Sequence, residues 1–229
     1  LRAIFPHSAE LALLWDRAAR RGVLMGRMGV ALGIDPWAAH SAGLFEECGK
    51  AVLFRHASER YRAMLHAADD DVALLLLEHE AFGVSHDALG AALCESWGLA
   101  AAAVASVRHH IEVQTTHELP PHVQRRSICA LSAMAHALMT APETLEEVAN
   151  AVAPQAQLDE IEALNAELAP FRILTGIEVD ILEDGTLDQD EDLLARLDVV
   201  VASVHSKLRM ESALMTQRMV LAMASPHTD

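Results

Sequence analysis

The chain has few cysteines, few aromatic residues, few positive charges and no long apolar run. Only three of its 229 residues are cysteine, at positions 48, 94 and 129, and only 4% are aromatic. The cysteines are odd in number, widely spaced and set in apolar helical sequence, as expected of reduced thiols in a cytosolic protein. These absences exclude a small disulfide-stabilised domain and favour a cytoplasmic location.

Positive charge is scarce as well. The sequence has 17 Lys and Arg against 33 Asp and Glu, for a formal net charge of −16. This balance repels phosphate backbones, and no cluster of Lys or Arg is long enough to act as a local exception. A nucleic acid is therefore not an expected partner.

No segment has the length of a membrane span. The longest apolar runs, such as GLAAAAVASV at 98–107, fall well short of the roughly 20 residues that cross a bilayer. No basic n-region opens the chain, so we expect a soluble protein without a membrane partner. The sequence starts without a methionine and stops at His-Thr-Asp, so we expect it to be trimmed at both ends.

Helical periodicity dominates up to about residue 169 and predicts about seven helices packed on one another. Ser8 is placed to cap a first helix that ends near Gly33. Asp35 and Pro36 open a second helix that carries the stretch GLFEECGK at 43–50. Further starts are predicted at Ser58 and, with Ser85 as the cap, at HDALGAALCESWG.

The pattern changes after Pro170. Residues 172–182 are rich in β-branched side chains, Asp184-Gly185 marks a turn, and 198–205 is a continuous apolar run typical of a buried parallel strand. A helical pattern lies between the two strands and another follows them. We expect a mostly α protein: a helical domain at 1–157 and a βαβα segment at 158–229, joined by a polar connector helix, PQAQLDEIEALNAELAPF.

Two groups of polar residues stand out in the helical part. Glu46 and Glu47 interrupt an apolar run. This acidic pair is a metal site, the relic of a metal site, or the solvated edge of a helix. His109 and His110 are adjacent and so cannot both face a helix's core side, because neighbours point about 100° apart. A buried, hydrogen-bonded histidine beside a solvated one is the simpler interpretation.

The order Leu14-Trp15, GLFEECGKAVLF, ERY, EHEAFGVSHDALGAALCESWGL and RHH resembles the HDOD domains, the regulatory relatives of the HD phosphohydrolases. The resemblance covers about 1–157 and implies an HD-like helical bundle. The further N-terminal helical region that HDOD domains normally carry is missing from this sequence.

The resemblance also allows the metal-binding positions of catalytic HD relatives to be compared. The first histidine of those relatives falls on Arg17, the His-Asp pair on Glu46 and Glu47, and the late aspartate on His136. The metal-binding histidines of active relatives are matched by His86, His109 and His110, and the retained Gly49-Lys50 makes Lys50 the candidate catalytic residue.

A permanent cation at Arg17 disfavours a metal ion. Repulsion between it and a divalent ion at about 4 Å costs several kcal/mol even at an effective dielectric near 20. An ion pair from Arg17 to Glu46 or Glu47 is the simpler arrangement, so the acidic pair is interpreted as a relic. Glutamates do bind hard metals, so the alternative is a rebuilt centre of Glu46, Glu47, His86, His109, His110 and His136.

The tail, through GIEVDI and ASVHS, resembles the PHP phosphoesterases, in particular the form associated with bacterial X-family DNA polymerases. The resemblance implies that Glu178 and His205 are metal ligands at the C-terminal ends of buried strands, with Asp180 on the same face as Glu178. Lys207 and Arg209 either meet a phosphate or are solvated charges. The remaining ligands of PHP sites are absent, so the tail is expected to be a partial PHP segment.

Two parallel strands alone leave both sheet edges unpaired and are not independently stable. The tail is therefore expected to pack on the helical part, pair with another chain, or be poorly ordered. A natural tail, a fragment, an engineered chimera and a rearranged gene all remain open for this unusual domain order.

We expect a non-catalytic regulatory module that binds an unidentified protein partner in bacterial signalling and needs no cofactor. The alternative is a metal-dependent phosphoesterase that uses Mn, Fe or Zn at the rebuilt centre or at Glu178 and His205. A third possibility is a structural helical domain that forms a homodimer through the exposed edge of the tail.

Overall fold

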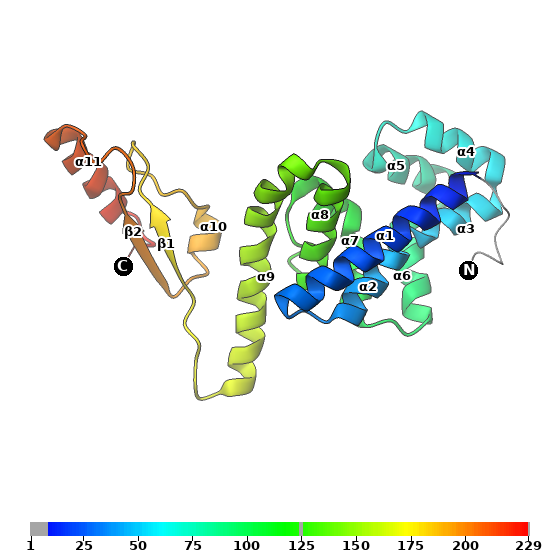
Figure 1. Ribbon diagram of the computed structural model, residues 1–229, viewed down its shortest axis with the longest axis horizontal. Helices are drawn as coiled ribbons and strands as arrows, with labels where there is room; N and C mark the ends of the chain where they lie inside the picture. The colour runs from blue at the N-terminus through cyan, green and yellow to red at the C-terminus, as the bar shows by residue number, and fades with distance from the viewer. Residues whose placement is uncertain (1–8, 124–125, 229) are drawn as a thin grey trace. The chain divides into compact units, whose positions relative to one another are not determined.

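The structure, a computed structural model, describes residues 9–123 and 126–228 (Figure 1). The chain divides into two compact units, a helical unit at Leu1–Gln157 and a C-terminal unit at Leu158–Asp229. The predicted fold class, mostly α with a C-terminal βαβα segment, is confirmed. Within the described residues, no helix is long and apolar enough to cross a membrane.

The helical unit follows the predicted order closely. Predicted helix starts at Ser58 and just after Ser85 are confirmed, whereas Ser8 lies outside the described residues. The helices are α1 (Ala9–Leu32), α2 (Pro36–Phe45), α3 (Cys48–His56), α4 (Ser58–Ala67), α5 (Asp71–Phe82), α6 (His86–Ser96), α7 (Ala101–Thr116) and α8 (Ser127–Thr140), then a 3₁₀ turn (Pro142–Thr144) and α9 (Leu145–Leu168).

α1 and α2 form a closely packed helical hairpin. Asp35 caps α2, with its Oδ1 accepting from the backbone N of Trp37 at 2.9 Å and of Ala38 at 3.2 Å. Gly43 on α2 lies directly against α1, because a Cβ there would stand 2.8 Å from the Met25 sulfur. The two helix axes can approach this closely only because the contact residue has no side chain.

One continuous helix through GLFEECGK was predicted, and this is wrong. α2 ends at Phe45 and α3 begins at Cys48, so Glu46 and Glu47 form the junction between them. The reason is the contact that follows: a Cβ on Gly49 would lie 2.0 Å from the carbonyl oxygen of His86. The chain changes direction at the acidic pair in order to bring the start of α3 onto the start of α6.

The apolar core of the helical unit is split into separate clusters. One, which includes Met25 and Leu131, lies among α1, α2, α7, α8 and the first half of α9. Another, which includes Leu53 and Tyr61, lies among α1, α3, α4 and α5. The buried cysteines are free thiols, as expected, and Cys48 and Cys94 join α3 to α6.

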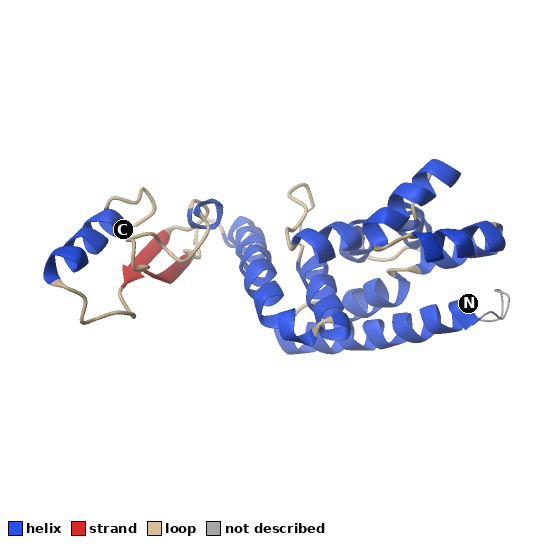
Figure 2. Ribbon diagram, turned by 90° about the horizontal axis from the view of Figure 1, so that it is seen from above, coloured by secondary structure: helices blue, strands red, loops and turns tan. Residues whose placement is uncertain are grey.

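The C-terminal unit contains a two-stranded parallel sheet (Figure 2). Its strands are β1 (Gly176–Asp180) and β2 (Val199–Ser203); α10 (Glu191–Leu194) lies between them and α11 (Ser212–Met223) follows. The order is as predicted, although α10 is only four residues long because the first part of the crossover forms a turn closed by an Ile181–Leu187 bridge. The connector helix was predicted to begin at Pro154 but begins nine residues earlier, with Pro154 inside it.

The two faces of this sheet differ. Val179, Val200 and Leu194 form a small buried cluster on one face. On the other face Val199 and Val201 remain 38% and 52% exposed. Parallel sheets are normally covered on both faces, so the second face of this sheet is unusually open.

Candidate functional site

Glu47 lies at the centre of a buried ion-pair chain. Arg17 binds it in a bidentate manner, with Nε and Nη2 at 2.8 Å and 2.7 Å from the two carboxylate oxygens. Lys50 Nζ lies 2.8 Å from Glu47 and 2.6 Å from Asp71 on α5. Burial alone would raise the pKa of Glu47, but Lys50 and Arg17 hold it well below its usual range. The ion pair predicted for Arg17 is therefore present.

Glu46 has a separate set of partners and is 1% exposed. Its Oε1 accepts hydrogen bonds from Arg21 and, at 2.7 Å, from the side-chain amide of Gln114. Its Oε2 accepts from the hydroxyl of Ser132 at 2.7 Å. Burial opposes the charge of Arg21, yet Glu46 and Glu47 raise the pKa of its guanidinium. Glu46 thus ties α1, α7 and α8 to the junction.

Glu78 is a third buried carboxylate and it orients His86. It accepts a hydrogen bond from the Tyr61 hydroxyl and another, at 2.7 Å, from the backbone N of His86. The His86 Nδ1 lies 2.8 Å from the same carboxylate, which favours the tautomer with the proton on Nδ1. His86 Nε2 then carries a lone pair, and it has no hydrogen-bond partner among the described residues.

His110 and His136 also carry a nitrogen without a hydrogen-bond partner in the part of the chain that the structure describes. His110 Nδ1 donates to the carbonyl of Val107 at 2.8 Å, and its Nε2 has no partner among the described residues. The rings of His110 and His86 are 5.5 Å apart. Burial lowers the pKa of both His110 and His136, and in His136 nearby Arg21 lowers it further. His110 and His136 therefore favour the neutral state.

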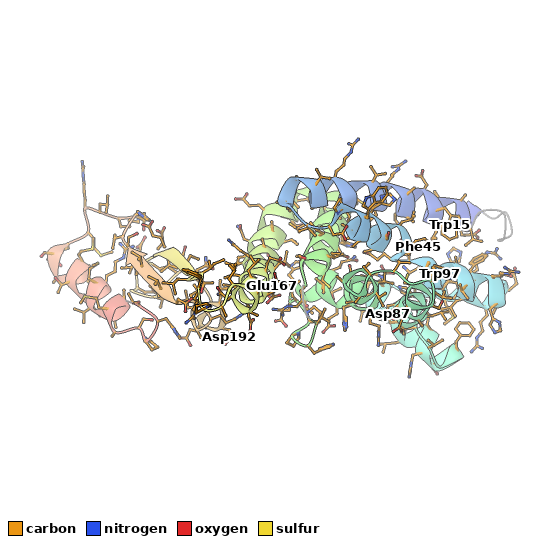
Figure 3. All side chains as sticks on the ribbon, turned by 90° about the horizontal axis from the view of Figure 1, so that it is seen from below. Trp15, Phe45, Asp87, Trp97, Glu167 and Asp192 are labelled. Carbon is orange, nitrogen blue, oxygen red and sulfur yellow. The ribbon has the colours of Figure 1, made fainter. Side chains whose placement is uncertain are left out.

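His109 points away from this group, as predicted for one member of an adjacent pair. Its Nδ1 lies 3.1 Å from Glu112, and its ring is 5.1 Å from that of His122. It lines a cavity of about 550 Å³ between α6 and α7, where half of the lining residues are alanines and Glu95 and Arg108 also contribute. Beside this region Phe45 packs edge-on against Trp97 at 5.4 Å (Figure 3).

The residues around the acidic pair do not fit a metal centre. Arg17, Arg21 and Lys50 occupy the carboxylate oxygens that a metal ion would need. Within the described ranges, no three His, Cys, Asp or Glu side chains are grouped so that they could hold a metal ion. Lys50 is itself ion-paired, and although burial opposes its charge, Glu47 and Asp71 raise the pKa of its ammonium. A protonated Lys50 lacks the lone pair that a general base needs.

The C-terminal candidates gather where β1 lies beside the end of β2. Glu178, expected at the C-terminal end of a buried strand, is instead the middle residue of β1. Asp180 contacts His205 Nδ1, while Ser203 Oγ lies 2.8 Å from Glu178 and 3.1 Å from His205 Nε2. The hydrogen bond and charge of Asp180 raise the pKa of His205. Glu178 and His205 are 61% and 57% exposed and 3.4 Å apart. Of the predicted phosphate contacts, Lys207 instead lies 3.4 Å from Glu183, and Arg209 is exposed.

The partners of Glu46, which are Arg21, Gln114 and Ser132, were not predicted from the sequence. Arg21 lies one helical turn after Arg17, a spacing that places both on one face of α1 and was a usable signal. Gln114 and Ser132 gave no such signal, because they reach Glu46 across 68 and 86 residues of sequence.

The HDOD domain family matches residues 2–113. An HDOD domain at residues 2–113 is therefore confirmed, over a shorter range than the predicted 1–157. Two solved structures share its fold: a predicted phosphohydrolase of Shewanella amazonensis SB2B has a TM-score of 0.51 at 17% identity, over 66% of this chain and 58% of that one. The MmoQ response regulator of Methylococcus capsulatus str. Bath has a TM-score of 0.53 at 21% identity, over 62% of this chain and 57% of that one. These likenesses support the predicted HD-like helical fold.

A curated relative matches a shorter segment. The DNA polymerase/3'-5' exonuclease PolX of Bacillus subtilis (strain 168) is 49% identical over 73 residues, or 32% of this chain and 13% of that protein. The relative is a DNA polymerase of the kind to which residues 158–229 were predicted to be similar. The assignment of these residues to the PHP family stays a prediction. The chain thus spans only a small part of that curated relative and just over half of the two solved structures.

Proposed function

We propose that the helical unit is a non-catalytic HDOD module that serves as a binding platform for a protein partner in signalling. The observation that carries this proposal is that positively charged side chains already bind both carboxylates of the acidic pair. Glu47 is held by Arg17 and Lys50, and Glu46 by Arg21. The positions that would hold a metal ion in a catalytic relative instead cross-link four helices.

Energetics support a structural role for these groups. Admitting a divalent cation would require Arg17, Arg21 and Lys50 to leave the carboxylates, because like charges at about 4 Å repel by several kcal/mol at an effective dielectric near 20. Stripping a buried charge of its partner costs a further 3–5 kcal/mol or so. The network is therefore suited to holding the helices rigidly and leaving function to the outer surface.

A metal-dependent phosphoesterase is the second candidate, and one observation favours it. His86 Nε2, His110 Nε2 and His136 Nδ1 are buried nitrogens without a hydrogen-bond partner among the described residues, and such nitrogens are ordinary metal ligands. Glu178 and His205 offer a second, exposed set of donors. No cofactor is needed if the binding-platform proposal holds.

Hydrolysis of bis-nitrophenyl phosphate separates the two functions. The full chain would be assayed with added manganese or zinc, beside the variants His110→Ala and Glu178→Ala. The binding-platform proposal expects all three proteins to release nitrophenol at the rate of metal-containing buffer. Activity above that rate that is lost in one of the variants would contradict it and would also identify the unit that holds the reaction centre.

A further inference from the structure

α1 carries a regular stripe of exposed side chains. Three of them are large and apolar: Leu13, Val23 and Val30 are 72%, 48% and 71% exposed. Charged residues alternate with them, and all are solvent-exposed. The complete stripe, at alternating intervals of three and four residues, is Leu13, Asp16, Arg20, Val23, Arg27 and Val30. This is the spacing of a coiled-coil seam.

The stripe faces away from the contacts that α1 makes within its own unit. Gly22 and Gly29 lie against α2, where a Cβ would stand 3.1 Å from the His40 oxygen or the Pro36 Cα. Arg17 and Arg21 reach the acidic pair. Figure 2 shows the helix that begins beside the N label running along the outer edge of the helical unit. This outer face of α1 is therefore open to a second helix, whose packing would cover the apolar positions.

We propose that α1 pairs with α1 of a second copy of this chain, antiparallel and about a two-fold axis. Closed homodimers use the same surface on both copies, so residue i meets j and j meets i. With the axis between positions 21 and 22, Leu13 of one copy meets Val30 of the other. The same register places Asp16 opposite Arg27 and Arg20 opposite Val23.

Charge selects this arrangement. Arg27 makes no ion pair with any described residue, and Asp16 has only Arg20 at 2.9 Å as an ion-pair partner within that part of the chain. The antiparallel register supplies each Arg27 with a carboxylate from the other copy, twice per dimer. A parallel pair would instead oppose Arg20 to Arg20 and Arg27 to Arg27, and like charges across a seam disfavour that orientation.

Small side chains beside the stripe allow the two helices to approach. Positions 12 and 19, which flank it on one side, are both exposed alanines. Gly26, further along the same side, faces α2, where a Cβ would stand 3.2 Å from the His40 Cβ. Close approach lets the aliphatic stem of Arg20 cover Val23 of the other copy while its guanidinium stays in water. The seam is short, so a weak dimer is expected, with a dissociation constant on the order of micromolar.

Charge reversal tests the seam by sedimentation velocity on the full chain. Asp16→Lys and Arg27→Glu each turn two attractions into repulsions and are expected to weaken dimerisation about tenfold. The double variant restores the pairing with reversed signs and should dimerise like the original chain. Leu76→Glu, at a 69% exposed apolar position on α5, is the control and should leave the dimer unchanged.

Cysteine cross-linking tests the orientation and register. The antiparallel seam predicts that mixing Leu13→Cys protein with Val30→Cys protein yields a disulfide-linked dimer under mild oxidation, and that neither variant alone does. Cross-linking of Leu13→Cys with itself would show a parallel pair and overturn the proposal. A chain that stays monomeric at about 100 µM, or a dimer unaffected by Arg27→Glu, would overturn it as well.

Discussion

The two units place the carboxylates of their candidate sites in opposite environments. In the helical unit Glu46, Glu47 and Glu78 are buried, and each has partners from other helices. In the C-terminal unit Glu178 and His205 are more than half exposed and pair at the open ends of two strands. Buried charges without partners are costly, whereas exposed ones lose little when unpaired. The helical unit therefore depends on its buried carboxylates for stability. The buried charge of the C-terminal unit is instead Arg218, which donates to the backbone carbonyls of Ile181, Leu182 and Ser206.

Removing a network carboxylate is the strongest way to test this difference. Glu46→Ala leaves Arg21 buried without its closest carboxylate and removes the acceptor of Gln114 and Ser132. We expect a loss of about 3–5 kcal/mol in the free energy of unfolding, measured by urea denaturation followed by circular dichroism. Glu178→Ala is the matched control, and a loss there as large as in Glu46→Ala would remove the distinction between the units.

The junction beside the acidic pair can be broken without changing charge. Gly49→Ala forces a Cβ to within 2.0 Å of the His86 carbonyl oxygen, so we expect a loss of about 3 kcal/mol. Gly90→Ala on the facing helix is the control, because its Cβ would meet two side-chain atoms at 3.3 and 3.4 Å and the Gly49 backbone N at an ordinary contact distance of 3.5 Å. There, a gain in helix propensity of about 1 kcal/mol offsets the strain. Equal melting temperatures for the two variants would contradict the close approach of α3 and α6.

Acid sharpens the comparison because the buried carboxylates and His205 respond in opposite directions. The pKa values of Glu47 and Asp71 are lowered in the folded state, despite burial, chiefly by Lys50. These two carboxylates therefore stabilise the fold at pH values above the pKa that they have in the unfolded chain. The stabilisation is lost as the pH falls through the pKa that they have in the folded state. The lowered pKa of His110, due mainly to burial, acts in the same direction. The helical unit should unfold more readily as the pH falls below about 5.

For His205 the sign is reversed. Asp180 raises its pKa, so the stabilisation from this pair is present at acid pH and is lost as the pH rises through the folded pKa. Thermal melts of the original chain and of Glu47→Gln between about pH 2 and about pH 8 test the first half of this account, because the Glu47 contribution is lost below its unfolded pKa. In Glu47→Gln the melting temperature should fall less steeply as the pH is lowered. An unchanged dependence of melting temperature on pH would mean that other groups cause the loss of stability in acid. NMR titration of His205 tests the second half.

The smallest effect is expected at the surface of the C-terminal unit. Lys207 and Glu183 are about 60% exposed and 3.4 Å apart. Lys207→Ala should change the free energy of unfolding by less than about 0.5 kcal/mol, as measured by urea denaturation. A larger loss would mean that this pair is packed into the unit rather than solvated.

Periodicity predicted the elements better than it predicted their breaks. The helix starts at Ser58 and after Ser85, and the βαβα order of the tail, followed from local patterns. The break at Glu46 and Glu47 did not, because these residues favour helix locally and only the tertiary contact at Gly49 bends the chain there. Pro154 was predicted to start a helix but lies inside α9.

The candidate site was predictable only where two residues lie close in sequence or are linked by charge. The pairing of Arg17 with the acidic pair could be foreseen because an unpaired buried carboxylate is unfavourable. The choice of Ser132 and Gln114 as partners of Glu46 depends on how α7 and α8 are rotated in the bundle, which no local pattern determines.

The claim that fixed cations fill the acidic pair is tested most directly by measuring metal content. The full chain would be purified without chelators and then equilibrated with manganese, iron or zinc. If fixed cations saturate the acidic pair, elemental analysis of the dialysed and still folded protein should find far less than one metal ion per chain. A stoichiometric metal ion that is lost in Glu46→Gln would contradict the account, because it would show that the network opens to form a metal centre.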